Sequence, residues 1–361
     1  SLDLYPCSMT IAGTLFQRYK RHRSLQTGVI TAMPLVVLMP HSGCNCRCVM
    51  CDIWKGNQQR QQLTANDIRH LLVSLKQLGT RQVLMSGGEA LLHPAFFELC
   101  DILKQEAISV VLLSTGKKKK KHALLLTEKV SEIIVSLDGD RLTHDRIRNI
   151  SGAFDLLQEG VQSIRQIDST YRITARTVLH RLNFRLLGNI ISAAKEMGLD
   201  QISFLPADVS SHAFNREVLW SGERQEEIMI AREDLPELKT VQKKINAERG
   251  RDIGFIAESP DRLMEIHTYY AALQGLAPFP YRKCNAPWVS AVVEADGNVR
   301  PCFFHEAMGN IHEGELKAVL NSEQAVRFRK DLDVASHPTC EKCVCRLYLS
   351  TGTSLSTKQR P

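Results

Sequence analysis

The amino-acid sequence predicts an α/β fold in which a parallel sheet carries one functional rim. Helical patterns separate six short apolar segments that are rich in β-branched residues. In "TANDIRHLLVSLKQLG", for example, Leu71, Leu72, Leu75 and Leu78 fall at helical spacing behind Thr64, which can cap the helix start. Strands and helices that alternate in this way are typical of βα units and a parallel sheet. The six predicted strands are 35–39, 82–86, 110–114, 132–137, 172–179 and 201–205.

Composition favours a globular chain with one large domain and a smaller one. The 361 residues are 43% apolar and 24% charged. No apolar run approaches the roughly eighteen residues of a membrane span, and the first residues lack the apolar core of a signal peptide. We therefore expect a cytoplasmic protein with no membrane partner. The net charge of +7 suits an acidic protein partner, and the sequence lacks the arginine and aromatic stripe that would favour nucleic acid.

The unusual residues of the first half follow the predicted strands. The first strand leads into a cysteine loop, the second into Gly87-Gly88-Glu89, and the fourth carries Ser136 near its end, before Asp138-Gly139. Ligands of parallel sheets and barrels bind at the carboxyl ends of the strands. The sequence therefore predicts that one rim holds the site.

The cysteine loop holds Cys44, Cys46, Cys48 and Cys51 within eight residues. Clustered thiols in a reducing compartment usually bind metal or perform chemistry. The spacing has no distant second pair of the zinc-finger type, and it differs from that of bacterial ferredoxins. Three of these cysteines would hold three irons of a [4Fe–4S] cube and leave the fourth iron open to a ligand.

"CNCRCVMC" resembles the C-x3-C-x2-C loop of radical S-adenosylmethionine (SAM) enzymes, and "MSGGEALLHP" resembles their GGE motif on the next strand. The resemblance implies a partial (β/α)6 TIM barrel, open on one side. It implies that Cys44, Cys48 and Cys51 hold a [4Fe–4S] cluster whose fourth iron binds SAM. Cys46 is then a spare, buried thiol.

The same resemblance implies the SAM contacts. Glycines let the backbone approach the amino group of SAM, a glutamate accepts its hydrogen bonds, and a hydroxyl and a guanidinium suit its carboxylate. The predicted SAM-binding residues are Gly87, Gly88, Glu89, Ser136, Arg148 and Met50.

A second cysteine group lies between residues 284 and 345. "VVEADGNVRPC" predicts a hairpin that brings Cys302 beside Cys284, and "CEKCVC" supplies three further thiols. Two separated pairs would also suit structural zinc. The stretch resembles the SPASM/twitch extension of radical SAM enzymes, and the twitch form implies one auxiliary [4Fe–4S] cluster. The implied ligands are Cys284, Cys302, Cys340 and Cys343, with Cys345 or His305 as possible replacements.

These patterns divide the chain into five parts. An N-terminal extension precedes the radical SAM core, a charged helical linker follows the core, and a short tail follows the cluster domain. Their predicted ranges are 1–32, 33–208, 209–283, 284–350 and 351–361, in the order extension, core, linker, cluster domain and tail.

The resemblance implies a radical SAM oxidoreductase. Such an enzyme cleaves SAM to a 5′-deoxyadenosyl radical, abstracts hydrogen from its substrate, and uses the auxiliary cluster in the oxidation. We expect a small polar metabolite or natural-product intermediate as substrate, and flavodoxin or ferredoxin as electron donor. The alternatives are a radical SAM peptide maturase and, from another class, a zinc-stabilised nucleic-acid-binding protein. The sequence identifies neither the substrate nor a catalytic general base.

Overall fold

A nine-stranded sheet forms the centre of the computed structural model, which describes residues 11–116, 119–251 and 254–352. The strand order is β6-β5-β4-β3-β2-β1-β7-β8-β9, and every pair from β6 to β7 is parallel. All six predicted strands are confirmed, with ends that differ by one residue at most. Their bounds are β1 Leu35–Leu38, β2 Gln82–Met85, β3 Ser109–Ser114, β4 Glu132–Ser136, β5 Ile173–Leu179 and β6 Gln201–Pro206.

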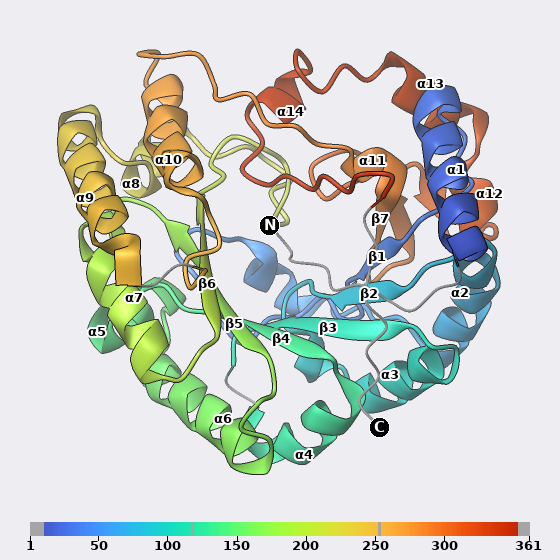
Figure 1. Cartoon of the computed structure of the whole chain (residues 1–361), viewed down its shortest axis with the longest axis horizontal. Helices are drawn as coiled ribbons and strands as arrows, with labels where there is room; N and C mark the ends of the chain where they lie inside the picture. The colour runs from blue at the N-terminus through green and yellow to red at the C-terminus, as the bar shows by residue number, and fades with distance from the viewer. Residues whose placement is uncertain (1–10, 117–118, 252–253, 353–361) are drawn as a thin grey trace.

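Helices cover the outer, convex face of this curved sheet (Figure 1). The predicted helix after the cysteine loop is α2, and Thr64 caps it: its side chain accepts a hydrogen bond from the Asp67 backbone N–H, and Asp67 accepts one in return. The helices between the strands are α2 Ala65–Gln77, α3 Phe96–Gln105, α4 Lys119–Lys129, α5 Arg141–Arg148, α6 Ala153–Ile167 and α7 Leu187–Glu196, with the short 3-10 helices η1 Ile53–Gln58, η2 Ala90–Leu92 and η3 Phe184–Leu186. This architecture is the predicted partial (β/α)6 barrel.

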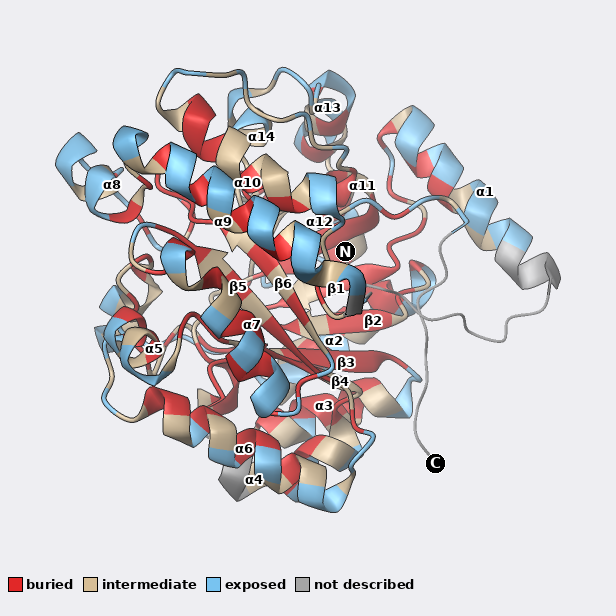
Figure 2. Ribbon diagram, turned by 60° about the vertical axis from the view of Figure 1, so that its left-hand side comes forward, coloured by how far each residue is buried: buried red, intermediate tan, exposed pale blue. Residues whose placement is uncertain are grey.

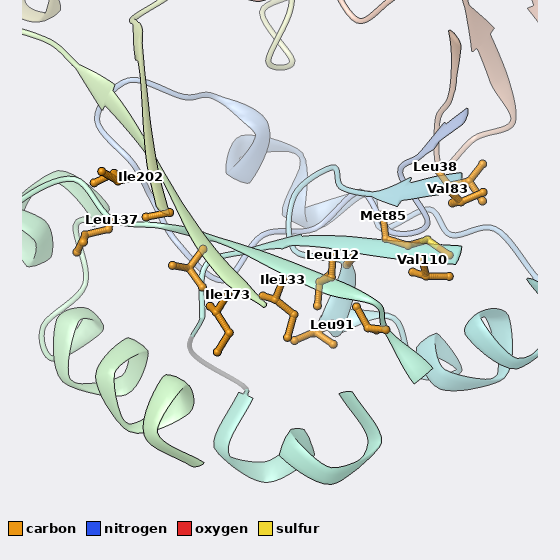
Figure 3. Close-up of a cluster of buried hydrophobic side chains, with 14 of the residues drawn as sticks. Leu38, Val83, Met85, Leu91, Val110, Leu112, Ile133, Leu137, Ile173 and Ile202 are labelled. Carbon is orange, nitrogen blue, oxygen red and sulfur yellow. The ribbon is translucent and has the colours of Figure 1, made fainter. Parts of the chain in front are cut away.

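The two faces of the sheet differ in character. Buried side chains of alternate strand residues, including Val83, Val110, Ile133 and Ile173, join the hydrophobic core beneath the helices (Figure 3). The strands are mostly buried, whereas the helices expose their outer faces (Figure 2). The other face lines the inside of the barrel, and there β4, β5 and β6 carry the polar side chains of Ser136, Arg176 and Ser203.

The C-terminal part continues the barrel sheet. Strand β7 (Ser290–Val293) pairs in parallel with β1, and β8 (Asn298–Arg300) and β9 (Gly309–Asn310) extend it antiparallel. The predicted hairpin is therefore confirmed as β7–β8, with Gly297 in the left-handed region at φ 87°. The pairing with β1, which the division into separate parts did not anticipate, fixes the cysteine-rich segment rigidly to the barrel.

The remaining helices connect the two cysteine-rich parts. The predicted helical linker contains α8 Gly222–Ile228, α9 Leu235–Glu248 and α10 Pro260–Leu273, with η4 Arg232–Asp234 and η5 Arg249–Arg251. The C-terminal part contains α11 Ala286–Val289, α12 Leu316–Leu320, α13 Glu323–Asp331 and α14 Pro338–Glu341. The segment that carries α14 crosses the open side of the barrel, between α10 and α11 (Figure 1).

The N-terminal extension is a helix, α1 (Ile11–Thr27), that lies beside the C-terminal part. Arg329 fixes the chain after this helix, because its buried guanidinium donates a hydrogen bond to the Gly28 carbonyl at 2.6 Å. Residues 1–10 and 353–361 of the two predicted end segments lie outside the described residues. Within the described ranges, every helix is too short or too polar to cross a lipid bilayer.

Candidate functional site

The cysteine loop between β1 and α2 brings the three predicted ligands together. Cys44 and Cys48 both lie within electrostatic range of Cys51, and Cys48 lies within range of Cys44. Asn57 closes the loop, since its side chain accepts a hydrogen bond from the Cys44 N–H at 2.8 Å and donates one to the Cys44 carbonyl at 2.9 Å. A converging set of three thiols suits an iron–sulfur cluster that leaves one iron open.

The thiols differ in acidity in the absence of iron. Burial raises the pKa of Cys44 to about 11 and that of Cys51 to about 12. A hydrogen bond from the Cys46 thiol lowers the pKa of Cys48, and the neighbouring Arg148 guanidinium lowers it further. Because thiolates are the ligands of such clusters, iron must displace protons from Cys44 and Cys51 when it binds.

Cys46 is buried, with 1% of its surface exposed, as predicted for a spare thiol. Its backbone N–H lies 3.5 Å from the Cys44 sulfur. Cys46 therefore packs against the predicted ligands from within the loop, and its exclusion from the ligand set stays a prediction.

The two glycines of the GGE motif lie against the cysteine loop. A β-carbon on Gly88 would lie 2.1 Å from the Gly43 carbonyl oxygen, and Gly87 adopts the left-handed φ of 108°. The Glu89 N–H donates a hydrogen bond to that same Gly43 carbonyl at 2.9 Å. Glycine at position 88 is thus required for the second strand end to touch the cysteine loop, in addition to its predicted role toward SAM.

The Glu89 carboxylate is 1% exposed and accepts four hydrogen bonds within the protein. Its donors are the Leu91 N–H, the Ser114 hydroxyl, and both the N–H and the hydroxyl of Thr115, at 2.6 to 3.2 Å. The Thr115 hydroxyl also lies 3.1 Å from the Asn45 side chain. In this conformation Glu89 organises the turn after β3, and its predicted hydrogen bond from SAM stays a prediction.

Arg148 lies directly beneath the cysteine loop. Its guanidinium forms a buried ion pair with Asp138 and lies 3.4 Å from the Cys48 sulfur. Its Nε is buried without a hydrogen-bond partner in the described part of the chain. Arg148 therefore supports Cys48, and one donor remains for the predicted SAM carboxylate. Met50, another predicted SAM residue, is buried in the same loop.

A row of polar side chains crosses the inside of the barrel. Ser136 on β4 pairs in register with Arg176 on β5, which pairs with Ser203 on β6. Arg176 has a buried Nε without a partner, and its guanidinium makes no hydrogen bond or ion pair with any other described residue. Sequence analysis identified Ser136 but missed Arg176, which gives no local signal within a strand pattern.

The loop after β6 ties the two cysteine groups together. Arg216 is fully buried, pairs with Asp208 at 2.5 Å and lies 3.5 Å from the Met50 carbonyl in the first loop. Phe214, at the uncommon positive φ of 62°, packs its ring against Phe303 next to Cys302, with centroids 5.0 Å apart. Sequence analysis placed this loop in the linker and did not assign these residues to a site.

The C-terminal cysteines also converge. Cys284 lies within electrostatic range of each of the other four thiols of this group, and Cys340 lies within range of Cys302. Burial raises the pKa of Cys302 to about 12 and that of Cys340 to about 11. Four thiols with no acidic ligand among them fit an iron–sulfur cluster. The fifth, Cys345, lies near Arg176, Arg282 and Asp208.

A cavity of about 510 Å³ separates the loop after β6 from the C-terminal part. Asp208, His212 and Ala213 line it on the barrel side, and Cys343 and Arg300 line it on the other. Its volume is in the range of small-molecule sites, about 300–1,000 Å³.

Two family models match the chain. Residues 38–206 match the radical SAM superfamily, and residues 284–344 match SPASM, an iron–sulfur cluster-binding domain. The second match favours an auxiliary iron–sulfur cluster over zinc at the C-terminal cysteines.

Curated relatives match this chain over most of their own length. The AdoMet-dependent heme synthase of Methanosarcina barkeri is 24% identical over 86% of this chain and 91% of its own. The Fe-coproporphyrin III synthase of the same organism is 24% identical over 86% of this chain and 80% of its own. The PqqA peptide cyclase of Gluconobacter oxydans is 21% identical over 80% of this chain and 78% of its own.

Solved structures share the fold. SuiB of Streptococcus suis bound to S-adenosylmethionine aligns with a TM-score of 0.64 and 16% identity, over 96% of this chain and 80% of SuiB. The protein anSMEcpe, with bound AdoMet and a peptide, aligns with a TM-score of 0.61 and 18% identity, over 86% of this chain and 85% of its own.

We expect the three spaced cysteines to be essential and Cys46 to be dispensable. Replacing Cys44, Cys48 or Cys51 with Ala removes one of three iron ligands and should reduce 5′-deoxyadenosine formation to background. Cys46→Ala should retain most of it, because that thiol hydrogen-bonds to Cys48 but is not one of the predicted iron ligands. The assay is anaerobic SAM cleavage with dithionite, followed by chromatography. Background activity in Cys46→Ala would show that the ligand set is wrong.

Gly88→Ala should prevent assembly of the first cluster. The added methyl group would meet the Gly43 backbone, and overpacking already costs about 1–3 kcal/mol where side chains can yield. Gly188→Ala is the matched control, since a β-carbon there has open space apart from the Ile245 methyl at 3.7 Å. Iron content and visible absorbance of the reconstituted proteins measure the effect. Wild-type iron content in Gly88→Ala would refute the steric argument.

Proposed function

We propose that this chain, which belongs to the radical SAM superfamily and carries a C-terminal SPASM region, oxidises a small polar metabolite or natural-product intermediate. It is an enzyme that depends on SAM, a SAM-binding [4Fe–4S] cluster and an auxiliary cluster. When bound, the first cluster supplies the electron that cleaves SAM to a 5′-deoxyadenosyl radical. Cys284, Cys302, Cys340 and Cys343 would hold the auxiliary cluster, which would supply an acceptor for one electron from the substrate and so make the overall reaction an oxidation.

One observation carries this proposal: the cavity of about 510 Å³ borders both parts of the molecule. Cys343, a predicted auxiliary ligand, lines this cavity together with residues of the loop after β6. A substrate held there lies beside the proposed electron acceptor. The neighbouring Arg216 fixes this loop to the backbone of the first cysteine loop at Met50.

The placement of several predicted residues supports their proposed roles toward SAM. Arg148 holds Cys48 in position and keeps its buried Nε for the SAM carboxylate. Ser136 offers a hydroxyl on the barrel interior at the end of β4. Gly87 and Gly88 present backbone at the end of β2, where they would approach the amino group of bound SAM.

Arg176 favours an acidic group on the substrate. Its guanidinium points into the barrel between Ser136 and Ser203 and has no partner among the described residues. Glu258 is within electrostatic reach, but its carboxylate accepts a hydrogen bond from the Phe204 N–H at 3.0 Å. Arg176 is half-buried, but a buried Nε–H without a partner is costly, and a carboxylate or phosphate on the substrate would satisfy it.

The second candidate is a peptide maturase. A relative that matches most of this chain is named for cyclising the PqqA peptide, and anSMEcpe shares the fold and was solved with a peptide. A cavity that opens between two parts of the molecule can admit a peptide loop as well as a small molecule.

A direct experiment tests the proposal. The reconstituted protein is incubated anaerobically with SAM and candidate substrates, and 5′-deoxyadenosine formation above the substrate-free rate is measured. The panel contains Fe-coproporphyrin III, acidic and neutral small metabolites, and precursor peptides. Stimulation by small acidic compounds supports the proposal, and stimulation by peptides alone would replace it with the second candidate. Flavodoxin and ferredoxin are compared with dithionite as electron donors.

We expect the double variant Cys340→Ala/Cys343→Ala to separate SAM cleavage from product formation. It loses two of four auxiliary ligands and leaves the first cysteine loop unchanged. 5′-Deoxyadenosine should still form, whereas oxidised product should fall steeply because the substrate radical lacks its acceptor. Circular dichroism checks that the barrel is retained, since metal loss can unfold a small domain. Wild-type product yield would mean that these cysteines have only a structural role.

Arg176→Leu should weaken substrate binding without changing substrate-free SAM cleavage. A hydrogen bond to a charged group contributes about 1.5–3 kcal/mol, so KM should rise roughly 10- to 100-fold. Arg176→Lys should recover part of the loss because it keeps the charge. Arg181→Leu is the control, because Arg181 is exposed and donates a hydrogen bond to the Glu226 carbonyl. An unchanged KM in Arg176→Leu would remove the acidic group from the proposed substrate.

A further inference from the structure

His305 links two of the four cysteines assigned to the auxiliary cluster. It follows Cys302 by three residues, and its backbone N–H donates a hydrogen bond to the Cys302 carbonyl at 3.3 Å. Its side chain reaches across the site, so that Nε2 lies 3.3 Å from the sulfur of Cys340. His305 is 7% exposed, so water does not compete freely for this contact.

The ring of His305 is held on several sides. The rings of Phe328 and His337 each meet it edge to face, with centroids 5.0 Å apart. Its backbone carbonyl accepts a hydrogen bond from Arg300 at 2.9 Å, and Arg300 is in turn paired with Glu294. A ring fixed in this way is pre-organised toward the Cys340 sulfur.

His337 has a different role beside the same cysteine. Its Nδ1 accepts a hydrogen bond from the Thr339 N–H at 3.2 Å, which caps the short helix α14 that carries Cys340. The potential ligand atoms of His305, His337 and Cys340 all lie within 4.8 Å of one another. The trio therefore also has the composition of a mononuclear metal site, which the experiment below must separate from a cluster site.

We propose that His305 is a positioning residue of the auxiliary cluster, in which its Nε2–H donates a hydrogen bond to the Cys340 thiolate and raises the reduction potential of the cluster. A ligating thiolate carries no proton, so the pair can form a hydrogen bond only if the imidazole donates. Such a bond stabilises the reduced cluster, which has one more negative charge, over the oxidised one. A higher potential makes the cluster a better acceptor for an electron from the substrate radical.

This inference rests on the auxiliary cluster of the proposed function, but its test needs no substrate. The full chain is reconstituted with both clusters, and the potential of each is measured by an anaerobic redox titration followed by electron paramagnetic resonance. The signal of the first cluster is recognised by its change when SAM is added. His305→Leu removes the donor, His305→Gln keeps an N–H donor, and His337→Asn is the matched control that can still cap α14.

We expect His305→Leu to shift the auxiliary potential to a more negative value at unchanged iron and sulfide content. His305→Gln should retain most of the wild-type value, and His337→Asn should equal it. The first cluster should be unaffected in all three variants, which reports an intact barrel. Failure to find a substrate would leave this result unchanged.

Three results would overturn the inference. An unchanged potential in His305→Leu would show that the contact does not tune the cluster. Loss of auxiliary iron from His305→Leu, with the first cluster intact, would make His305 a ligand or an essential support of the site. Zinc bound by the wild type and lost from both His305→Leu and His337→Asn would make the trio a mononuclear metal site.

Discussion

The close backbone contact between the cysteine loop and the second strand end is the constraint on which the site depends. Only glycine at position 88 lets the two segments meet, because any β-carbon would overlap the Gly43 carbonyl. The same carbonyl accepts the Glu89 N–H, and the Glu89 carboxylate then fixes the turn after β3 through Thr115. Three consecutive strand ends are thereby locked in one arrangement, so the cysteines are presented in a fixed geometry before iron binds.

The buried ion pair of Arg148 and Asp138 supports the cysteine loop. Arg148 and Asp138 are both buried, and a buried ion pair is favourable only where its remaining hydrogen-bonding groups are satisfied. Asp138 meets this condition, because its second oxygen accepts the Val178 N–H at 3.0 Å. Arg148 meets it only in part, since Nε has no partner while another nitrogen lies beside Cys48. The Arg148 guanidinium favours the thiolate form of Cys48 over the thiol. It would also attract the carboxylate of an anionic ligand.

The sequence predicted the parts of the molecule that local patterns specify. Buried parallel strands are recognisable as short apolar segments of the sequence. The cysteine spacing and the GGE motif are each contained in a few consecutive residues. Strand β7 was predicted as a hairpin arm, but its pairing with β1, more than 250 residues earlier, has no local pattern. Arg176 and Arg216 were missed for the same reason, since each is one of 46 basic residues and only tertiary placement distinguishes it. The fold was therefore more predictable than the surroundings of the clusters.

The missed loop after β6 explains how the two cysteine groups can act together. Arg216 holds one end of this loop against the backbone of Met50, and Phe214 holds the other against Phe303, beside Cys302. A phenylalanine at positive φ is strained, and strain of about 1–3 kcal/mol persists only where the surroundings enforce it. Here the enforcing contacts are the aromatic packing of Phe214 and the buried Arg216–Asp208 pair. The loop thus connects the two cysteine groups and forms one wall of the cavity that Cys343 borders on the opposite side.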